Sequence, residues 1–268
     1  MDLTMKKRLI IISVLNILGF LGVVIINALA VILPLNNKTT EELSDQYPNL
    51  FVPAGLTFSI WGVIYILLAI FIVYGLITAI RKDTQKSSFV GGIGILFLIS
   101  CLANIGWIFA WHYEMVPLSL ALMLVLLGCL IIIYLRLNIG KSVATKTEKY
   151  SVLVPFSVYL GWITVATIAN VTALLVDMNW DALGLSEQLW AVAVIIVALA
   201  ITLAVLFLRR DVFYCLVVDL ALFGILMKRL SVDTTPDQNV ITISIVGLAV
   251  ITAGIIVQVV RKKAYHLS

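Results

Sequence analysis

The stretch Ala54–Ile80, AGLTFSIWGVIYILLAIFIVYGLITAI, contains no charged residue and decides the class of fold. A helix needs about 20 apolar residues to cross a hydrocarbon core about 30 Å thick, because each residue advances about 1.5 Å. This stretch is long enough to cross, and the basic residues Arg81 and Lys82 follow it directly. We therefore interpret it as a membrane-spanning helix.

The rest of the chain has the same character. Hydrophobic residues make up 62% of the sequence and charged residues 12%, whereas ordinary globular domains contain roughly 25% charged residues. So few polar residues cannot cover a fold that faces water on all sides. We predict an all-α, polytopic membrane helix bundle of about eight transmembrane helices, near residues 9–33, 54–80, 89–111, 116–135, 152–176, 189–208, 212–227 and 240–260.

The basic residues give this bundle an orientation. If each apolar stretch crosses once, 15 of the 18 Lys and Arg residues fall on one side of the membrane. Basic residues near span ends are retained in the cytoplasm, so both termini should be cytoplasmic. The basic residues are spread over short segments without interleaved aromatic residues, which argues against nucleic-acid binding. The three basic residues that fall on the other side of the membrane are Lys38, Lys228 and Arg229.

The amino-terminal stretch has features of a secretory signal. Met5-Lys6-Lys7-Arg8 precedes an apolar run that ends at Ala28-Leu29-Ala30, which imitates a cleavage site. The run from Leu9 to about Leu33 exceeds the roughly 7–15 residues of a signal peptide's apolar region. We therefore expect the first helix to be retained.

Polar and aromatic side chains recur at helical spacing inside the predicted spans. Asn104, Trp107 and Trp111 fall within about 60° of one another around a helix. Such a stripe inside a membrane indicates either a seam of interhelical hydrogen bonds or a ligand cavity, and spacing leaves both open. The second and fifth spans carry similar stripes, and the candidate ligand-binding residues are Trp61, Tyr65, Asn104, Trp107, Trp111, Tyr159, Trp162, Ala166 and Asn170.

Asp219 is the acidic residue near the middle of the seventh predicted span. A carboxyl group in hydrocarbon is costly to ionise, so it could take part in proton coupling or a hydrogen bond to a neighbouring helix. The alternative is a short or re-entrant helix in which Asp219 reaches water.

Metal and hydrolytic chemistry have little support in the sequence. Cys101, Cys129 and Cys215 lie inside spans without metal-ligand spacing, so we interpret them as packing residues. We interpret His112, beside Glu114, as an interfacial side chain, because a single His is weak evidence for a metal, and the alternative is a ligand contact or a haem ligand. No Ser-His-Asp set, H-E-x-x-H or nucleotide-binding loop is present, so an enzymatic role is uncertain and disfavoured.

Three motifs resemble the TspO/MBR family, the tryptophan-rich sensory or translocator proteins. Pro48–Tyr65 is similar to that family's P-x-W-x-P-P loop and W-x-x-L-Y helix. Asn104-Ile105-Gly106-Trp107, followed by Trp111, is similar to its N-x-x-W-x-x-x-F. Trp162-Ile163-Thr164-Val165-Ala166-Thr167-Ile168-Ala169-Asn170 is similar to its W-x-x-x-A-T-x-x-N. The resemblance covers roughly residues 9–176.

The chain also departs from the family pattern. Leu50 replaces the loop Trp, Val52 replaces the first Pro of the pair, and Pro155 precedes Trp162 by seven positions instead of about four. The resemblance implies a five-helix core at residues 1–176, with a three-helix extension at residues 177–268 like that of larger bacterial members. Both parts would form one integral membrane domain.

The resemblance implies binding of a flat hydrophobic ligand such as a porphyrin, haem or a sterol-like molecule. The family's ligand contacts map onto Trp61, Asn104, Trp107 and Trp162, with Ala166 beside them. Trp61 and Trp162 also match the tryptophans that are linked to porphyrin breakdown in some members. A sensor or carrier is therefore the first interpretation, and the alternatives are a proton-coupled transporter that uses Asp219 and a porphyrin-modifying enzyme.

The same interpretation sets the expected partners. No cofactor or metal is required, although porphyrin or haem could be the ligand. The expected partners are a hydrophobic small molecule and the lipid bilayer, and we expect that bilayer to be a bacterial cell membrane. Ala249 and Ala253 could support helix association, which leaves a homodimer open.

Overall fold

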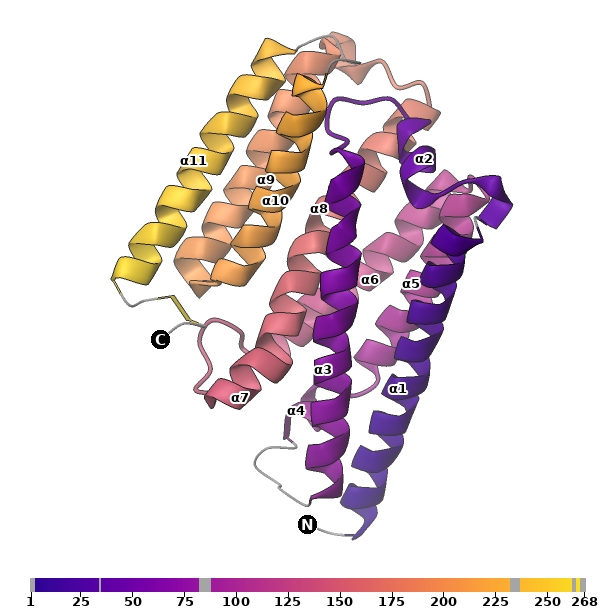
Figure 1. Cartoon of the computed structure of the whole chain (residues 1–268), viewed down its shortest axis with the longest axis vertical. Coiled ribbons are helices and arrows are strands. Elements are labelled where there is room, and N and C mark those ends of the chain that lie inside the picture. The colour runs from indigo at the N-terminus through magenta and orange to yellow at the C-terminus, as the bar shows by residue number, and fades with distance from the viewer. Residues whose placement is uncertain (1–2, 34, 82–87, 232–236, 262–263, 266–268) are drawn as a thin grey trace.

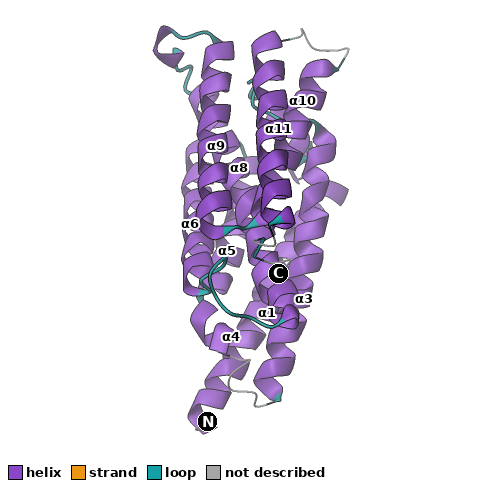
Figure 2. Cartoon of the chain, turned by 90° about the vertical axis from the view of Figure 1, so that its left-hand side faces the viewer, coloured by secondary structure: helices purple, strands orange, loops and turns teal. Residues whose placement is uncertain are grey.

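The computed structural model describes residues 3–33, 35–81, 88–231, 237–261 and 264–265, and in these ranges it is an all-α helix bundle. Eight long helices run roughly along one axis (Figures 1 and 2). They are α1 (Leu3–Ile32), α3 (Ile60–Ile80), α5 (Leu96–His112), α6 (Val116–Arg136), α8 (Val154–Asp177), α9 (Glu187–Arg209), α10 (Val212–Leu230) and α11 (Gln238–Val260).

Short elements connect the long helices. They are η1 (Leu35–Asn37), α2 (Thr40–Asp45), η2 (Gly55–Ser59), α4 (Ser88–Ile93), α7 (Lys146–Glu148), η3 (Lys149–Leu153) and η4 (Ala182–Gly184). Each predicted span therefore overlaps one of the long helices, and the polytopic all-α prediction is confirmed.

The helices have the length and composition of membrane spans. Six of those in the described residues are long and apolar enough to cross a bilayer: α1, α3 with η2, α6, α8 with α7 and η3, α9, and α11. Of the other two, α5 is apolar but has only 17 residues, and α10 carries Asp219, Lys228 and Arg229. Large apolar side chains remain exposed on the outer faces, for example Ile66 and Phe207. Such an apolar outer surface suits lipid as the surrounding solvent.

The third predicted span is not one continuous helix. It is divided into α4 and α5 at Gly94, whose φ of +56° is left-handed. Glycine takes this conformation readily because it has no β-carbon. The prediction of one helix over 89–111 is therefore wrong at this point.

Helix α8 is the centre of the bundle. Of its most apolar 18 residues, 78% are buried, compared with 28–39% in the other five spans that meet the same length and composition criteria. Helices α3, α6 and α10 all pack against it. Close approach of α10 depends on Gly161, where an added β-carbon would lie 3.0 Å from the carbonyl oxygen of Tyr214.

A buried Asp side chain connects the start of α10 to α6 and α8. Asp211 is fully buried at the start of α10, where its Oδ1 accepts a hydrogen bond from the N–H of Tyr214 at 3.2 Å. Its Oδ2 accepts hydrogen bonds from the hydroxyl groups of Tyr134 on α6 (2.9 Å) and Ser157 on α8 (2.7 Å). Asp211 is not among the residues predicted from the sequence. The available signal is an Asp directly before a helix, which is a favoured N-cap.

Two of the basic residues that the sequence sets apart from the other 15 form ion pairs at one end of the bundle. Lys38 pairs with Glu114 and Lys228 with Asp45, at the end of the bundle opposite to the amino terminus (Figure 1). We call this the outer end. Which side of the membrane it faces stays a prediction. Four of the basic residues in the orientation argument lie outside the described residues: Lys82, Lys86, Lys262 and Lys263.

Candidate ligand-binding site

Trp61, in the first turn of α3, is the centre of an aromatic cluster. Its ring centroid lies 6.3 Å from that of Trp107 on α5 and 6.1 Å from that of Trp162 on α8. Tyr65 stacks on it at 5.8 Å, and Tyr159 meets it edge-on at 6.3 Å. Three helices that are distant in sequence therefore bring the predicted aromatic residues together, and their rings pack on one another inside the bundle.

Trp111 connects this cluster to the outer end. It stacks on Trp107, with centroids 6.2 Å apart and ring planes 17° apart. Its Nε1 donates a hydrogen bond to the carbonyl oxygen of Thr40 on α2 over 3.4 Å, and Tyr47 packs against its ring. The segment α2 is therefore held directly over the aromatic cluster.

Two cavities lie within the bundle beneath α2, and we call them the inner cavities. The smaller one, beside α8, has a volume of about 50 Å³ and is lined by Thr40, Ser44, Pro53, Phe58, Trp61, Trp107, Trp111, Trp162, Val165, Ala166, Ala169 and Asn170. The larger one, beside α1, has a volume of about 300 Å³ and is lined by Asn27, Val31, Thr39, Thr40, Glu41, Phe58, Trp61, Tyr65, Trp107 and Ile108.

The indoles of Trp61 and Trp107 line both inner cavities and so lie between them. Ligand pockets usually measure about 300–1,000 Å³, so only the larger cavity reaches that range. The smaller one has room for about one or two water molecules. A macrocycle could enter only if these indoles moved aside and joined the two spaces.

The buried Asn side chains form seams between helices. Asn27 Nδ2 on α1 donates a hydrogen bond to Asn104 Oδ1 on α5 over 2.9 Å, and Asn104 Nδ2 lies 3.5 Å from the Tyr159 hydroxyl on α8. Asn170 Nδ2 donates a hydrogen bond to Ser119 Oγ on α6 over 3.0 Å. The seam interpretation therefore applies to the amides, and the indoles line cavities whose use by a ligand stays a prediction.

Three donors beside the inner cavities have no acceptor within the described residues. They are the Tyr65 hydroxyl, Trp107 Nε1 and Trp162 Nε1, and all three atoms are buried. A buried donor without a partner costs about 1–3 kcal/mol. A ligand that carries hydrogen-bond acceptors could recover part of this free energy.

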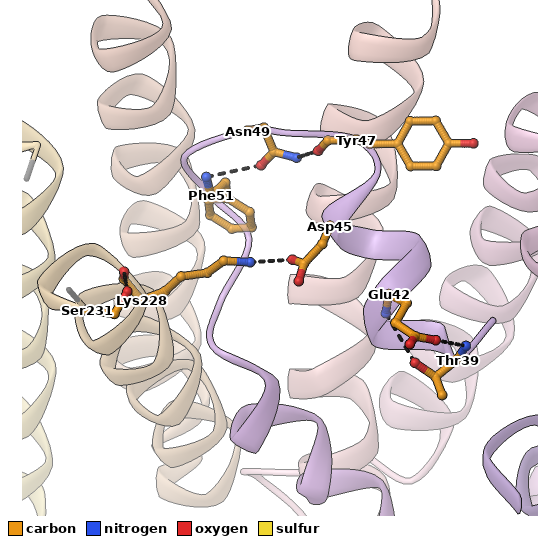
Figure 3. A network of polar contacts seen from close by, with 8 residues as sticks. All are labelled: Thr39, Glu42, Asp45, Tyr47, Asn49, Phe51, Lys228 and Ser231. Atoms are coloured by element: carbon orange, nitrogen blue, oxygen red, sulfur yellow. Dashed lines mark hydrogen bonds and ion pairs between the residues drawn. The ribbon is translucent and has the colours of Figure 1, made fainter. Parts of the chain in front are cut away.

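Residues 46–54, which we call the strap, cross from α2 to η2 and cover the cluster from the outer end. Inside the strap, Asn49 Nδ2 donates a hydrogen bond to the Tyr47 carbonyl (2.8 Å), and Asn49 Oδ1 accepts one from the Phe51 N–H (3.1 Å) (Figure 3). Phe51 and Val52 are buried. Leu50, which takes the place of the family's loop Trp, lines a separate cavity of about 110 Å³ near Trp180 and Trp190.

The strap is attached to α10. The N–H of Ala54 donates a hydrogen bond to the carbonyl oxygen of Gly224 over 2.9 Å, and Lys228 pairs with Asp45 at the end of α2 (Figure 3). A β-carbon at Gly224 would lie only 2.0 Å from Thr57 Oγ1. Glycine therefore permits this close approach between the cover of the cavities and the last three helices.

At its other end α2 is fixed by a capping box. Glu42 accepts a hydrogen bond from the N–H of Thr39 at 2.7 Å, and the Glu42 N–H donates to Thr39 Oγ1 at 3.2 Å (Figure 3). The hydrogen bond from the Thr39 N–H, aided by one from its hydroxyl, lowers the pKa of Glu42 below its usual value.

Asp219 lies apart from the aromatic cluster. Its Oδ2 accepts a hydrogen bond from Thr252 Oγ1 on α11 over 3.0 Å, and its Oδ1 is buried without a hydrogen-bond partner within the described residues. Helix α10 is continuous from Val212 to Leu230, and whether it is re-entrant with Asp219 in contact with water stays a prediction. The carboxyl group faces the interface between α10 and α11.

His112 and the three cysteines are all buried in the bundle. His112 is fully buried, so the prediction of an interfacial side chain is wrong; its Nδ1 lies 2.8 Å from the Ile108 carbonyl oxygen. The three cysteines are buried and unpaired, as expected for packing residues. Among the described residues, no group of three His, Cys, Asp or Glu side chains could hold a metal ion.

The fold and this site define a polytopic α-helical membrane protein with tryptophan-lined cavities inside its bundle. A family model described as TSPO-like protein matches residues 13–257, and the chain belongs to that family. No curated protein and no solved structure matches it significantly. The matched range continues through α9, α10 and most of α11, further than the motifs alone indicated. The division at residues 176 and 177 stays a prediction.

Proposed function

We propose that this protein is a membrane sensor or carrier that binds a flat hydrophobic ligand, such as a porphyrin, haem or a sterol-like molecule, among its helices. The observation that carries the proposal is the convergence of Trp61, Trp107 and Trp162 around the inner cavities. Indole faces stack well on planar apolar molecules, and a few polar groups in such a pocket fix the orientation. Membership of the TSPO-like family supports a membrane ligand-binding role in general terms.

The proposed function implies a location, an orientation and a cofactor requirement for the protein. It would lie in a bacterial cell membrane with both termini in the cytoplasm, and it would need no resident cofactor or metal. Porphyrin or haem would enter as a ligand, and a homodimer is left open. Separation of the Trp61 and Trp107 rings would accompany binding, because these rings lie between the two cavities.

Quenching of tryptophan fluorescence by protoporphyrin IX in purified protein tests the proposal. We expect saturable quenching that is lost or strongly weakened in Trp61→Phe and Trp162→Phe. Trp190→Phe is the matched control, because Trp190 lies at the start of α9 and outside the lining of the inner cavities. Quenching that does not saturate, or that is unchanged in both cavity variants, would contradict a pocket at this place.

The same assay separates the two alternative functions. Light-dependent bleaching of the porphyrin that requires Trp61 and Trp162 would favour a porphyrin-modifying enzyme. A transporter coupled to protons is favoured by one observation, the half-buried Asp219 carboxyl group between α10 and α11. For that function, Asp219→Asn should abolish pH-dependent uptake into proteoliposomes, and unchanged pH dependence would remove Asp219 from the mechanism.

A further inference from the structure

The inner cavities have a distinct charge character. Among the lining residues named above, Glu41 alone carries a charge, and it is negative. Glu41 is exposed at the edge of the larger cavity, and its carboxylate lies against the start of η2, where a β-carbon at Gly55 would lie 1.7 Å from Glu41 Oε1. No Lys or Arg is among those residues, so a buried anionic ligand would find no counter-charge there.

Two basic residues close to the cover of the cavities already have anionic partners. Lys38, which directly precedes the lining residues Thr39 and Thr40, pairs with Glu114, and Lys228 pairs with Asp45. A ligand carboxylate at the outer end would have to compete with these carboxylates for the same ammonium groups.

Tyr47, in the strap, lies near two acidic residues. Burial raises the pKa of the Tyr47 phenol above its usual value, and the negative charges of Asp177 and Glu114 raise it further. The strap therefore lies near Asp177 as well as near the ion pair of Lys38 and Glu114.

The buried donors without a partner favour ligands that carry uncharged hydrogen-bond acceptors. The Tyr65 hydroxyl, Trp107 Nε1 and Trp162 Nε1 are neutral donors that have no acceptor in the part of the chain that the structure describes. A carbonyl, ester or ether oxygen can accept from such donors at a small desolvation cost. A carboxylate loses far more hydration free energy when it is buried without a cation.

We infer that the inner cavities select uncharged flat ligands with hydrogen-bond acceptors on their edge, and that they discriminate against dicarboxylates of the same shape. This inference rests on the proposed function and names the ligand class for the same site. It favours sterol-like ketones and esterified macrocycles over free porphyrin diacids.

A matched pair of ligands tests the inference. Protoporphyrin IX and its dimethyl ester share the macrocycle and differ by two negative charges at neutral pH. We would titrate both into the full-length protein in neutral detergent, correct for partition into protein-free micelles, and follow tryptophan quenching. The diester should bind about tenfold or more tightly than the diacid, because one unpaired carboxylate costs at least this much on burial.

Two variants assign the preference to the site. Glu41→Gln should reduce the ratio of diester affinity to diacid affinity severalfold, mainly by strengthening the binding of the diacid. Glu187→Gln removes the same charge from the first turn of α9, outside the lining of the inner cavities, and should leave the ratio unchanged. An equal effect of both variants would show that the discrimination is a general surface-charge effect, and it would overturn the assignment to the inner cavities.

The remaining outcomes separate this inference from the proposed function. A diacid that binds as tightly as the diester, with quenching lost in Trp61→Phe, would overturn the ligand class and leave the pocket in place. Saturable binding of neither compound would overturn the proposed function and the inference with it.

Discussion

Asn27 on α1 donates its side-chain amide to Asn104 on α5 over 2.9 Å inside the membrane, and the same Asn104 lies within reach of Tyr159 on α8. A double-mutant cycle of Asn27→Val and Asn104→Val should give a coupling free energy of about 0.6 kcal/mol, and at most about 1.7 kcal/mol. Unfolding in mixed micelles measures it. Strictly additive effects would show that this hydrogen bond does not contribute to stability.

Gly224 should be among the least replaceable residues of α10. In Gly224→Ala the new β-carbon would meet Thr57 Oγ1 at 2.0 Å and Pro53 Cβ at 3.0 Å, so the strap or the helix must move, at a cost of about 1–3 kcal/mol. Adding Thr57→Ala should restore part of the thermal stability. Gly62→Ala is the matched control, because its β-carbon would meet nothing within 4 Å. Equal melting temperatures for Gly224→Ala and Gly62→Ala would refute the tight contact.

Asp211→Ala should destabilise the junction between α6, α8 and α10. It removes an N-cap and leaves the buried hydroxyl groups of Tyr134 and Ser157 without this acceptor, a loss of about 2–4 kcal/mol in the free energy of unfolding. Ser186→Ala, which removes a single exposed cap on α9, should cost about 1 kcal/mol. Similar losses in the two variants would mean that the carboxylate acts only as a cap.

Ala166 offers a steric test of the smaller cavity. A Leu side chain at this position would occupy the space of about 50 Å³ beside Trp162. We expect Ala166→Leu to weaken ligand binding by about tenfold or more, because a ligand would have to displace the added carbon atoms. Ala193→Leu, on an exposed part of α9, should bind normally. Binding is measured by quenching, and unchanged affinity in Ala166→Leu would place the ligand elsewhere.

The capping box predicts how α2 responds to pH. Because the pKa of Glu42 is lowered in the folded state, its stabilising contribution is complete above the unfolded carboxyl pKa, about 4.3. The contribution is lost as pH falls through the lower folded-state pKa. Hydrogen exchange of α2, corrected for intrinsic rates, should show loss of protection in acid. Glu42→Gln keeps an acceptor without the charge, and its protection should not change over the same range.

Hydropathy and charge were sufficient to predict the helices. The fourth span, expected at 116–135, is α6 at Val116–Arg136, because an uninterrupted apolar run in a membrane has no alternative to helix that satisfies its backbone. The break at Gly94 was not predicted, since hydropathy does not report backbone conformation and the apolar run continues on both sides of it. Four residues, Gly91-Gly92-Ile93-Gly94, were the signal for it.

The sequence predicted which residues share a helix face, but it did not predict the size or arrangement of the cavities that these residues line. Helical spacing placed Asn104, Trp107 and Trp111 together, and all three are buried on one side of α5. Spacing could not give the partner of Asn104, which lies 77 residues earlier, or the division of the interior by Trp61 and Trp107. Both depend on how helices pack in three dimensions. Whether a ligand uses these residues stays a prediction.

The attachment of the strap at Ala54 and Gly224 makes the roof of the inner cavities a joint property of both halves of the chain. A chain cut back to its first five spans would keep every tryptophan of the cluster and still lose this hydrogen bond and the ion pair between Lys228 and Asp45. The last three helices therefore help to hold the strap in place, so ligand binding should be measured on the full chain.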